Sequence, residues 1–395
     1  MIPEVVDSAD LPQARGAESL AVRASGLVFV SGIESHRGVP HALGQGEAVL
    51  ERLGSCGSRI AKIKVSGGDG VGRAANELRQ AFPSRPVPAM AWVGAALPGN
   101  EARVSVELIA GAADVPIELP GPALDRTGAS RVGGGTRLGD LVFTDCVCSS
   151  DSEWPGDLGR QSESIFASLA DTLASAGHSF ADVTKVNGTV AAFHGLQAYN
   201  RVYKRHLQEP YTARATIQGG LTQGALLGVE LIASAGSPRL TLESEIPGPW
   251  HEPRRAKQRD TLYSAALHPL KGPHSHAVRT GSLIFMAGAC PYDAQDQLIA
   301  PGDVAGQTRG TLENIRLMLR ALGSELDDIV KTNVTLANVA DFVEFDAAYA
   351  SYFHPPYPAR QTVGAGLAQP GMLVEIEAVA VVGAAREGIA LVGRG

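Results

Sequence analysis

A lysine within an apolar strand pattern occurs three times in this sequence, and that repetition constrains the fold more than any other feature. The phrase is IAKIKV around Lys62, VTKVNG around Lys185 and IVKTNV around Lys331, with spacings of 123 and 146 residues. An apolar, helix-like segment that ends at glycine precedes each phrase with the same spacings. Self-similarity in a constant register indicates one domain written three times. The chain therefore has a first, a second and a third copy.

The end of each copy carries two further landmarks. Alanine followed by arginine opens a strand-like segment at Arg214 and Arg360, whereas Met90 takes this place in the first copy. A later strand-like segment contains a glutamate that aligns between the copies: Glu107, Glu230 and Glu375. In the third copy a Gln-Pro-Gly turn separates the two segments, so we expect them to pair and to place Arg360 beside Glu375. Such a pair is either a cross-strand ion pair or part of a binding site.

Within each copy, the apolar pattern predicts a strand pair, a helix, a strand, a second helix and two closing strands. The helices carry apolar residues at three- and four-residue spacing, so each covers one face of a sheet, and the fold class is α+β. The uncovered faces need partners, which three copies in one chain can supply to one another around a pseudo-threefold axis. The register predicts domains at 14–115, 118–236 and 261–384, with residues 237–260 as a surface linker.

Composition and charge exclude several classes of function. The formal charge is −7, the sequence pI is about 5.8 and no basic stripe occurs, so we expect no nucleic-acid partner. No run of about eighteen apolar residues is present and the first residues lack a signal pattern, so we expect a cytoplasmic protein without membrane contact. Four cysteines without paired Cys-x-x-Cys spacing predict free thiols.

Several phrases of the third copy match a known family, and together they cover most of residues 272–382: GPHSHAV, GSLIFMAGACP, GQTRGTLENIRLMLRALGSELDDIVKTNV, PAR and VEIEAVA. Through them the third copy resembles the Rid (reactive intermediate deaminase, RidA/YjgF-like) family of small trimeric enamine and imine deaminases. The second copy resembles the family more loosely through TARAT and GVELIA, and the first keeps only the outline. The resemblance implies a chorismate-mutase-like fold, with three tandem RidA-like domains that form an intramolecular pseudo-trimer and share pockets between neighbours.

The resemblance also implies which residues act. They are Arg360, Thr362 and Glu375 in the third copy, and Arg214, Thr216 and Glu230 in the second. Each arginine would bind a substrate carboxylate through two parallel charged hydrogen bonds. Each glutamate would position or activate the water that attacks an imine carbon. Likeness to the family predicts that the third copy is the most active and that the first, with Met90 in place of the arginine, is inactive or repurposed.

The third copy departs from the family at the phrase GPHSH, where His274 occupies the place of a tyrosine. A histidine there either acts as an acid or base near neutral pH or only replaces the hydrogen bond of the phenol. With His276 and Cys290 it could also hold zinc, but no further ligand is evident, and we expect neither a metal nor an organic cofactor. Cys290 and Cys148 follow aligned phenylalanines by five residues, either as substrate contacts or as buried structural cysteines.

The sequence thus predicts a RidA-like hydrolase that acts on a small carboxylate-bearing imine or enamine, by default through water attack and loss of ammonia. Two alternatives stay open. One is a specialised biosynthetic enzyme that uses the scaffold for cyclisation, elimination or another hydrolysis; the other is a protein that binds a small acid without turnover. The expected partner is a small-molecule substrate alone, and further dimerisation of the pseudo-trimer is left open.

Overall fold

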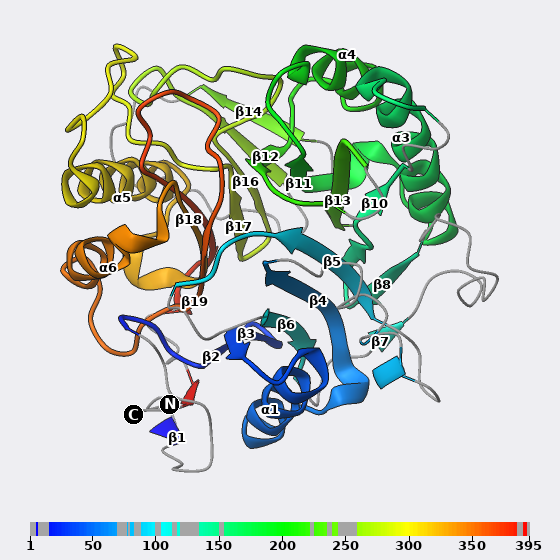
Figure 1. The fold of residues 1–395 in the computed structure, drawn as a ribbon, viewed down its shortest axis with the longest axis vertical. Coiled ribbons are helices and arrows are strands. Elements are labelled where there is room, and N and C mark those ends of the chain that lie inside the picture. The colour runs from blue at the N-terminus through cyan, green and yellow to red at the C-terminus, as the bar shows by residue number, and fades with distance from the viewer. Residues whose placement is uncertain are drawn as a thin grey trace.

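The computed structural model describes residues 5–6, 16–68, 77, 80–82, 88–98, 104–112, 117–118, 134–149, 154–221, 225–234, 239–243, 259–384 and 390–392. In this part of the chain there are three sheets of seven strands, one for each copy, with the helices on the outside of the molecule (Figure 1). The predicted α+β fold of three tandem domains is thus confirmed. The sheets surround a pseudo-threefold axis within a single chain.

The strands of each sheet follow one plan. The first sheet has the order β1 (Val5–Val6), β21 (Ala390–Val392), β2 (Ala21–Ala24), β3 (Leu27–Ser35), β6 (Val104–Gly111), β4 (Ile60–Gly67) and β5 (Ala89–Gly94). The second has β12 (Ala213–Gln218), β11 (Val183–Val190), β13 (Leu227–Ser234), β9 (Leu141–Thr144), β8 (Gly135–Leu138) and β7 (Ile117–Glu118), with β10 (Val147–Cys148) on β13. The third has β14 (Arg239–Glu243), β15 (Arg259–Tyr263), β16 (Ala277–Thr280), β17 (Leu283–Met286), β20 (Val374–Val381), β18 (Ile329–Leu336) and β19 (Ala359–Gly364).

The described helices form in segments where the apolar period predicts helix. They are α1 (Val39–Arg52), α3 (Leu158–Ser175), α4 (Leu196–His206), α5 (Val304–Ala321) and α6 (Phe342–Ala350). The first helix of each copy is followed by the predicted glycine in a left-handed conformation, with φ of 70° at Gly54, 71° at Gly177 and 74° at Gly323. The second helix expected in the first copy lies outside the described residues. None of the described helices is long and apolar enough to span a bilayer.

The prediction that the two closing strands pair with each other is wrong. In the third sheet β18 lies between them, parallel to β19 and antiparallel to β20. The crossover through α6 returns the chain parallel to β18, so β19 takes the outer edge and leaves the other side of β18 to β20. The other two copies have the same arrangement.

The segments between the copies extend the sheets. Residues 237–260, predicted as a surface linker, contain β14 and the start of β15, and these two strands pair in parallel at the edge of the third sheet. The last strand, β21, lies beyond the predicted end of the third domain and joins β2 and β1 in the first sheet. Strand pairing therefore links the end of the chain to its first copy.

The three sheets meet at the axis through their β5, β12 and β19 edges. Backbone bridges join Gly94 to Gly220, Ala96 to Gly364 and Gln218 to Gly366, each between two copies. Buried Val93, Ala95, Leu97, Ile217 and Val363 form an apolar cluster at this place. Burying apolar surface from all three copies stabilises the assembly, which explains why the sheets need no covering helix on their inner faces.

Candidate active site between the second and third copies

The two predicted arginines occupy equivalent places in the structure. Arg360 lies opposite Thr332 on the neighbouring strand, and Arg214 lies opposite Val186 in the same register of the second sheet. Met90 holds this position in the first sheet. The sequence alignment of these three residues is therefore correct.

The alignment of the glutamates is wrong. Glu230 lies opposite Asn187 and Glu107 opposite Lys64, whereas the residue in that register of the third sheet is Glu377. Glu375 lies two residues earlier on β20, opposite Thr335, where the other sheets have Gly228 and Ser105. A slip of two residues along a strand keeps every side chain on its face, so alternation in the sequence cannot reveal it.

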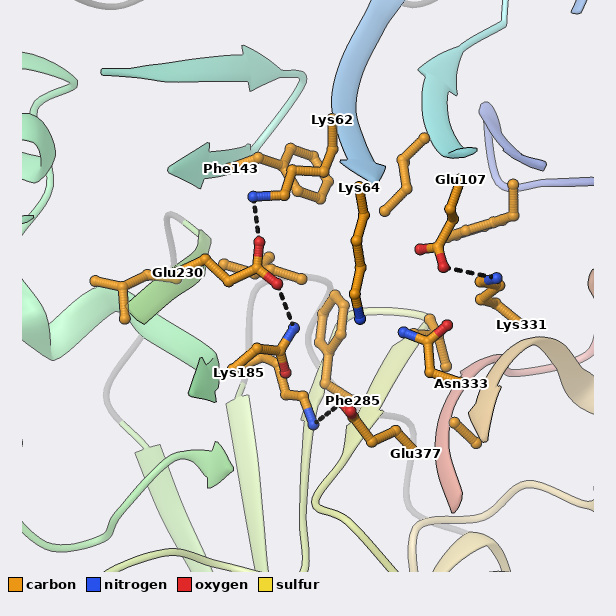
Figure 2. A pocket seen from close by; sticks show the side chains of 17 residues that line it. Lys62, Lys64, Glu107, Phe143, Lys185, Glu230, Phe285, Lys331, Asn333 and Glu377 are labelled. Atoms are coloured by element: carbon orange, nitrogen blue, oxygen red, sulfur yellow. Dashed lines mark hydrogen bonds and ion pairs between the residues drawn. The ribbon is translucent and has the colours of Figure 1, made fainter. Parts of the chain in front are cut away.

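The three glutamates that share a register in the structure lie around a central cavity of about 60 Å³ instead of beside the arginines: Glu107, Glu230 and Glu377. Each accepts an ion pair from a lysine of another copy: Lys62 with Glu230, Lys185 with Glu377 and Lys331 with Glu107. Figure 2 shows these pairs around the side chain of Lys64, which extends into the cavity. The lysine that repeats in the three copies therefore forms ion pairs between copies at the axis. Because Glu230 belongs to one of these pairs, we do not retain the catalytic role expected for it.

A pocket between the third and first copies shows which positions meet beside an arginine. It is lined by Glu18, Gly32, Glu34, Ser105, Arg360 and Thr362, among others. Parallel bridges place Ser19 beside Ala359 and Ser275 beside Ala213, so the copies contact each other in the same way at the next interface. We call these two places the third–first site and the second–third site.

By that pseudo-symmetry, the second–third site consists of His274, Gly288, Cys290, Glu375, Arg214 and Thr216. Two contacts support the placement. The N–H of Gly288 donates to the carbonyl of Arg214 at 3.3 Å, and the Glu375 carboxyl lies so close to Gly288 that a Cβ there would be 1.9 Å from its Oε1. Five of the residues predicted from the sequence thus meet at one interface.

The predicted partnership of Arg360 with Glu375 is accordingly wrong. Arg360 lies over the rings of Phe345 and Tyr349, on the face of the third sheet that α6 covers. Glu375 shares the opposite face with Glu377, because residues two apart on a strand point the same way. The two residues contribute to different sites.

Arg214 is available to an acidic ligand. Its Nη1 donates to the side-chain oxygen of Asn200 at 2.8 Å, and its guanidinium lies over the rings of Tyr199 and Tyr203 at 5.5 and 5.0 Å. Among the described residues no carboxylate forms an ion pair with it. A Cβ on Gly272 would lie 2.4 Å from its Nη2, so only glycine allows the guanidinium this position. A buried guanidinium with neutral partners is suited to binding an anion.

Glu375 has an environment that suits proton transfer. It is buried, and burial raises its pKa to about 8; the nearby carboxylate of Glu377 adds to this rise, while Lys185 opposes it. Near neutral pH most molecules hold the protonated form, and about a tenth hold the carboxylate. A carboxyl group that titrates close to the working pH can act as both acid and base.

His274 and Cys290 are neutral components of the site. Burial, with Arg214 next in effect, lowers the pKa of His274 well below its usual range, so the imidazole is uncharged at neutral pH and is no cationic acid. Burial and then Glu375 raise the pKa of the Cys290 thiol well above its usual range, which keeps it from acting as a thiolate nucleophile. The Nε2 of His276, the third zinc ligand considered from the sequence, contacts the carbonyl oxygen of His268 at 3.0 Å. No three potential metal ligands come together in the described part of the chain.

Two buried polar atoms near Arg214 have no hydrogen-bond partner among the described residues: Thr216 Oγ1 and His274 Nδ1. Buried polar atoms without partners are costly, and a ligand that supplies donors and acceptors removes that cost. The second–third site therefore combines a cation for a carboxylate, a carboxyl group for proton transfer and free hydrogen-bonding groups.

The interface between the first and second copies lacks both the arginine and the carboxyl group at the equivalent positions. Met90 occupies the arginine position, and Gly228 occupies that of Glu375. A Cβ on Gly228 would lie 2.9 Å from the sulfur of Cys146 and 3.0 Å from that of Cys148, so the two thiols fill the space of the missing carboxylate. Cys148 thus does not share the surroundings of Cys290, although both occupy equivalent strand positions.

Sequence reasoning missed Asn200, Gly272 and Gly288. Asn200 stands 146 residues before Asp346, which is the spacing of the two arginines, so the repeat register could have revealed it. Gly272 and Gly288 lie in the quoted phrases GPHSH and AGACP, but only the packing against Arg214 and Glu375 shows why they must lack side chains.

The fold and this site define a class of protein: a three-domain α+β chain with a candidate site between two domains. A family model described as Endoribonuclease L-PSP matches residues 137–235 and 265–382, more than half of the chain. The chain belongs to that family, which confirms the resemblance to the Rid proteins.

Individual relatives match one copy, whereas one solved structure matches most of the chain. RutC family protein PH0854 of Pyrococcus horikoshii is 40% identical over 109 residues, covering 28% of this chain and 86% of the relative. The 3-aminoacrylate deaminase RutC of Acinetobacter baylyi is 34% identical over 112 residues, covering 28% and 89%. A crystal structure of chorismatase covers 82% of this chain and 93% of its own, with a TM-score of 0.56 and 14% identity. That likeness shows the three-domain fold.

Proposed function

We propose that the chain hydrolyses a small carboxylate-bearing enamine or imine at the second–third site. The observation that carries the proposal is the difference between two equivalent arginines: among the described residues Arg214 has neutral partners alone, whereas Arg360 has two carboxylates. The interface of Arg214 also has a carboxyl group of raised pKa, that of Glu375. The relative named 3-aminoacrylate deaminase supports this substrate class.

In the proposed reaction, Arg214 binds the substrate carboxylate and Glu375 performs the proton transfers. Glu375 donates its proton to the enamine carbon, which turns the substrate into an iminium ion. The resulting carboxylate takes a proton from water as the water oxygen bonds to the iminium carbon. Glu375 then protonates the amine, ammonia leaves with the electrons of the C–N bond, and the hydroxyl proton returns to Glu375 as the carbonyl forms.

The remaining groups have supporting roles in this proposal. Neutral His274 and Thr216 offer hydrogen bonds to the reacting nitrogen or to the water. Cys290 and Gly288 shape the wall against which the carboxyl of Glu375 rests. No step requires a metal or an organic cofactor, and the cytoplasmic location expected from the sequence remains a prediction.

A second reaction class uses the same groups. An acid that protonates an enamine can also protonate another electron-rich double bond, such as an enol ether, after which water attacks the adjacent carbon. This is the specialised, non-deaminase alternative expected from the sequence, and the likeness to chorismatase concerns the fold and does not decide between the two. Binding of an acid without turnover is the third outcome.

The proposal is tested with 2-aminoacrylate generated in the assay by a serine dehydratase, with release of ammonia and the 2-oxo acid as readout. Losing the guanidinium leaves the substrate carboxylate unpaired, which costs on the order of 2–5 kcal/mol, so Arg214→Met should lower kcat/KM by about 30- to 5000-fold. Glu375→Gln should lower kcat by about 100-fold or more. Ser105→Ala, the matched change at the third–first site, should leave the rate unchanged. Full activity in Arg214→Met would refute the proposal.

A further inference from the structure

The guanidinium of Arg360 is held by carboxylates of the chain itself. Its Nε lies 3.2 Å from Glu18 Oε2, and its Nη2 lies 2.7 Å from Asp346 Oδ1. Arg360 is fully buried, and the void left in the third–first site is about 10 Å³, room for about one water molecule. A ligand carboxylate therefore finds the Nε and Nη2 of this arginine already paired with carboxylates.

Two substitutions between the copies account for the difference from Arg214. Glu18 stands where the second–third site has His274, because each directly precedes the serine that bridges to the neighbouring copy. Asp346 stands where α4 has Asn200, 146 residues earlier, which is also the spacing of the two arginines. The two positions that hold neutral residues near Arg214 thus hold carboxylates near Arg360.

The contacts around Glu18 fix it in this position. The N–H of the preceding Ala17 donates to both carboxylate oxygens of Asp346, at 3.0 and 3.3 Å. The N–H of Ser19 donates to the carbonyl of Pro358 at 3.2 Å. The backbone on both sides of Glu18 is therefore bound to the third copy, and its side chain has little freedom to leave the guanidinium.

We propose that Glu18 is a built-in substitute for an acid ligand: the third–first site is a carboxylate-binding site that the chain fills itself. This inference rests on the proposed role of Arg214 as the arginine that binds substrate. The wild-type chain then has one arginine site for a small acid, and emptying the other requires only that Glu18 and Asp346 become neutral. The ligand that fits the emptied site is a small monocarboxylate, because two carboxylate oxygens match one guanidinium.

Calorimetric titration with pyruvate tests the inference by counting sites, independently of turnover. The variant Glu18→His with Asp346→Asn reproduces the neutral partners of Arg214 and should bind one more pyruvate per chain than the wild type. Adding Arg360→Met to that variant should remove the extra site again, without leaving a buried carboxylate unpaired. A folded Glu18→His, Asp346→Asn chain that binds no more pyruvate than the wild type would overturn the inference. If the proposed role of Arg214 is wrong, the wild type should bind no pyruvate. The Glu18→His, Asp346→Asn variant should still bind one pyruvate per chain, so the two proposals fail separately.

A second measurement applies if that variant does not fold. Glu18→Ala leaves a space the size of a small acid beside Arg360, so acetate should raise its melting temperature in proportion to ln(1 + [acetate]/Kd). Chloride at equal ionic strength should have no such effect, and the wild type should not respond to acetate at this site. An acetate response of Glu18→Ala no larger than that of the wild type would contradict the inference.

Discussion

Replacing Glu375 by glutamine should change the pH dependence of stability, and the sign follows from the raised pKa. Below about pH 4.5, its ordinary pKa, the carboxyl is protonated in both the folded and the unfolded chain, so ionisation contributes nothing. Between pH 4.5 and 8 the unfolded chain releases the proton while the folded chain retains it. The free energy of unfolding therefore falls as the pH rises through this window and becomes constant above it.

The magnitude follows from the size of the shift. Raising the pKa from 4.5 to about 8 corresponds, at about 1.4 kcal/mol per pH unit, to a loss of about 5 kcal/mol by pH 8. Glutamine keeps the shape of the side chain and cannot ionise. Glu375→Gln should thus match the wild type in stability near pH 4.5 and exceed it increasingly up to pH 8, even though it lowers turnover.

Urea unfolding of both chains at pH 5, 6, 7, 8 and 9 measures this difference. The exposed Glu344→Gln serves as the control, because it makes the same chemical change outside the core. We expect the midpoint of Glu375→Gln to separate from that of the wild type with rising pH, and the midpoint of Glu344→Gln to follow the wild type. A constant separation at every pH would refute the argument that Glu375 retains its proton through burial.

Two further predictions concern packing. Gly288→Ala should lower turnover strongly with little change in melting temperature, because the new Cβ would lie 1.9 Å from the flexible carboxyl end of Glu375 and displace it; Gly44→Ala, where nothing lies within 4 Å, is the control, and equal activity in both would count against the site. Lys62→Met and Glu230→Gln should each destabilise the chain by about 3–5 kcal/mol, because each leaves a buried charge unpaired, while the double variant should recover most of that loss. Strictly additive unfolding free energies would show that this pair does not join the copies.

Much of the fold could be predicted from local patterns. The repeat register predicted three copies, the apolar spacing predicted the helices, and Gly54, Gly177 and Gly323 marked their ends, because a left-handed residue after a helix is a local requirement. The candidate residues were found in the same way, since a guanidinium, a carboxyl group and a histidine are visible in the sequence whatever surrounds them.

The tertiary structure alone decided which of these residues work together. Neighbours in a sheet can be far apart in sequence, so the position of β18 between β19 and β20 had no local signal. The side-chain period of two also hid the slip that separates Glu375 from Glu230. Because each site takes one wall from each of two copies, Glu375 lies at the interface to which the preceding copy contributes Arg214, and Arg360 pairs with Glu18 of the first copy. The sequence alone determined the three copies and the candidate residues, and the packing of three sheets around one axis determined which of these residues lie in the same site.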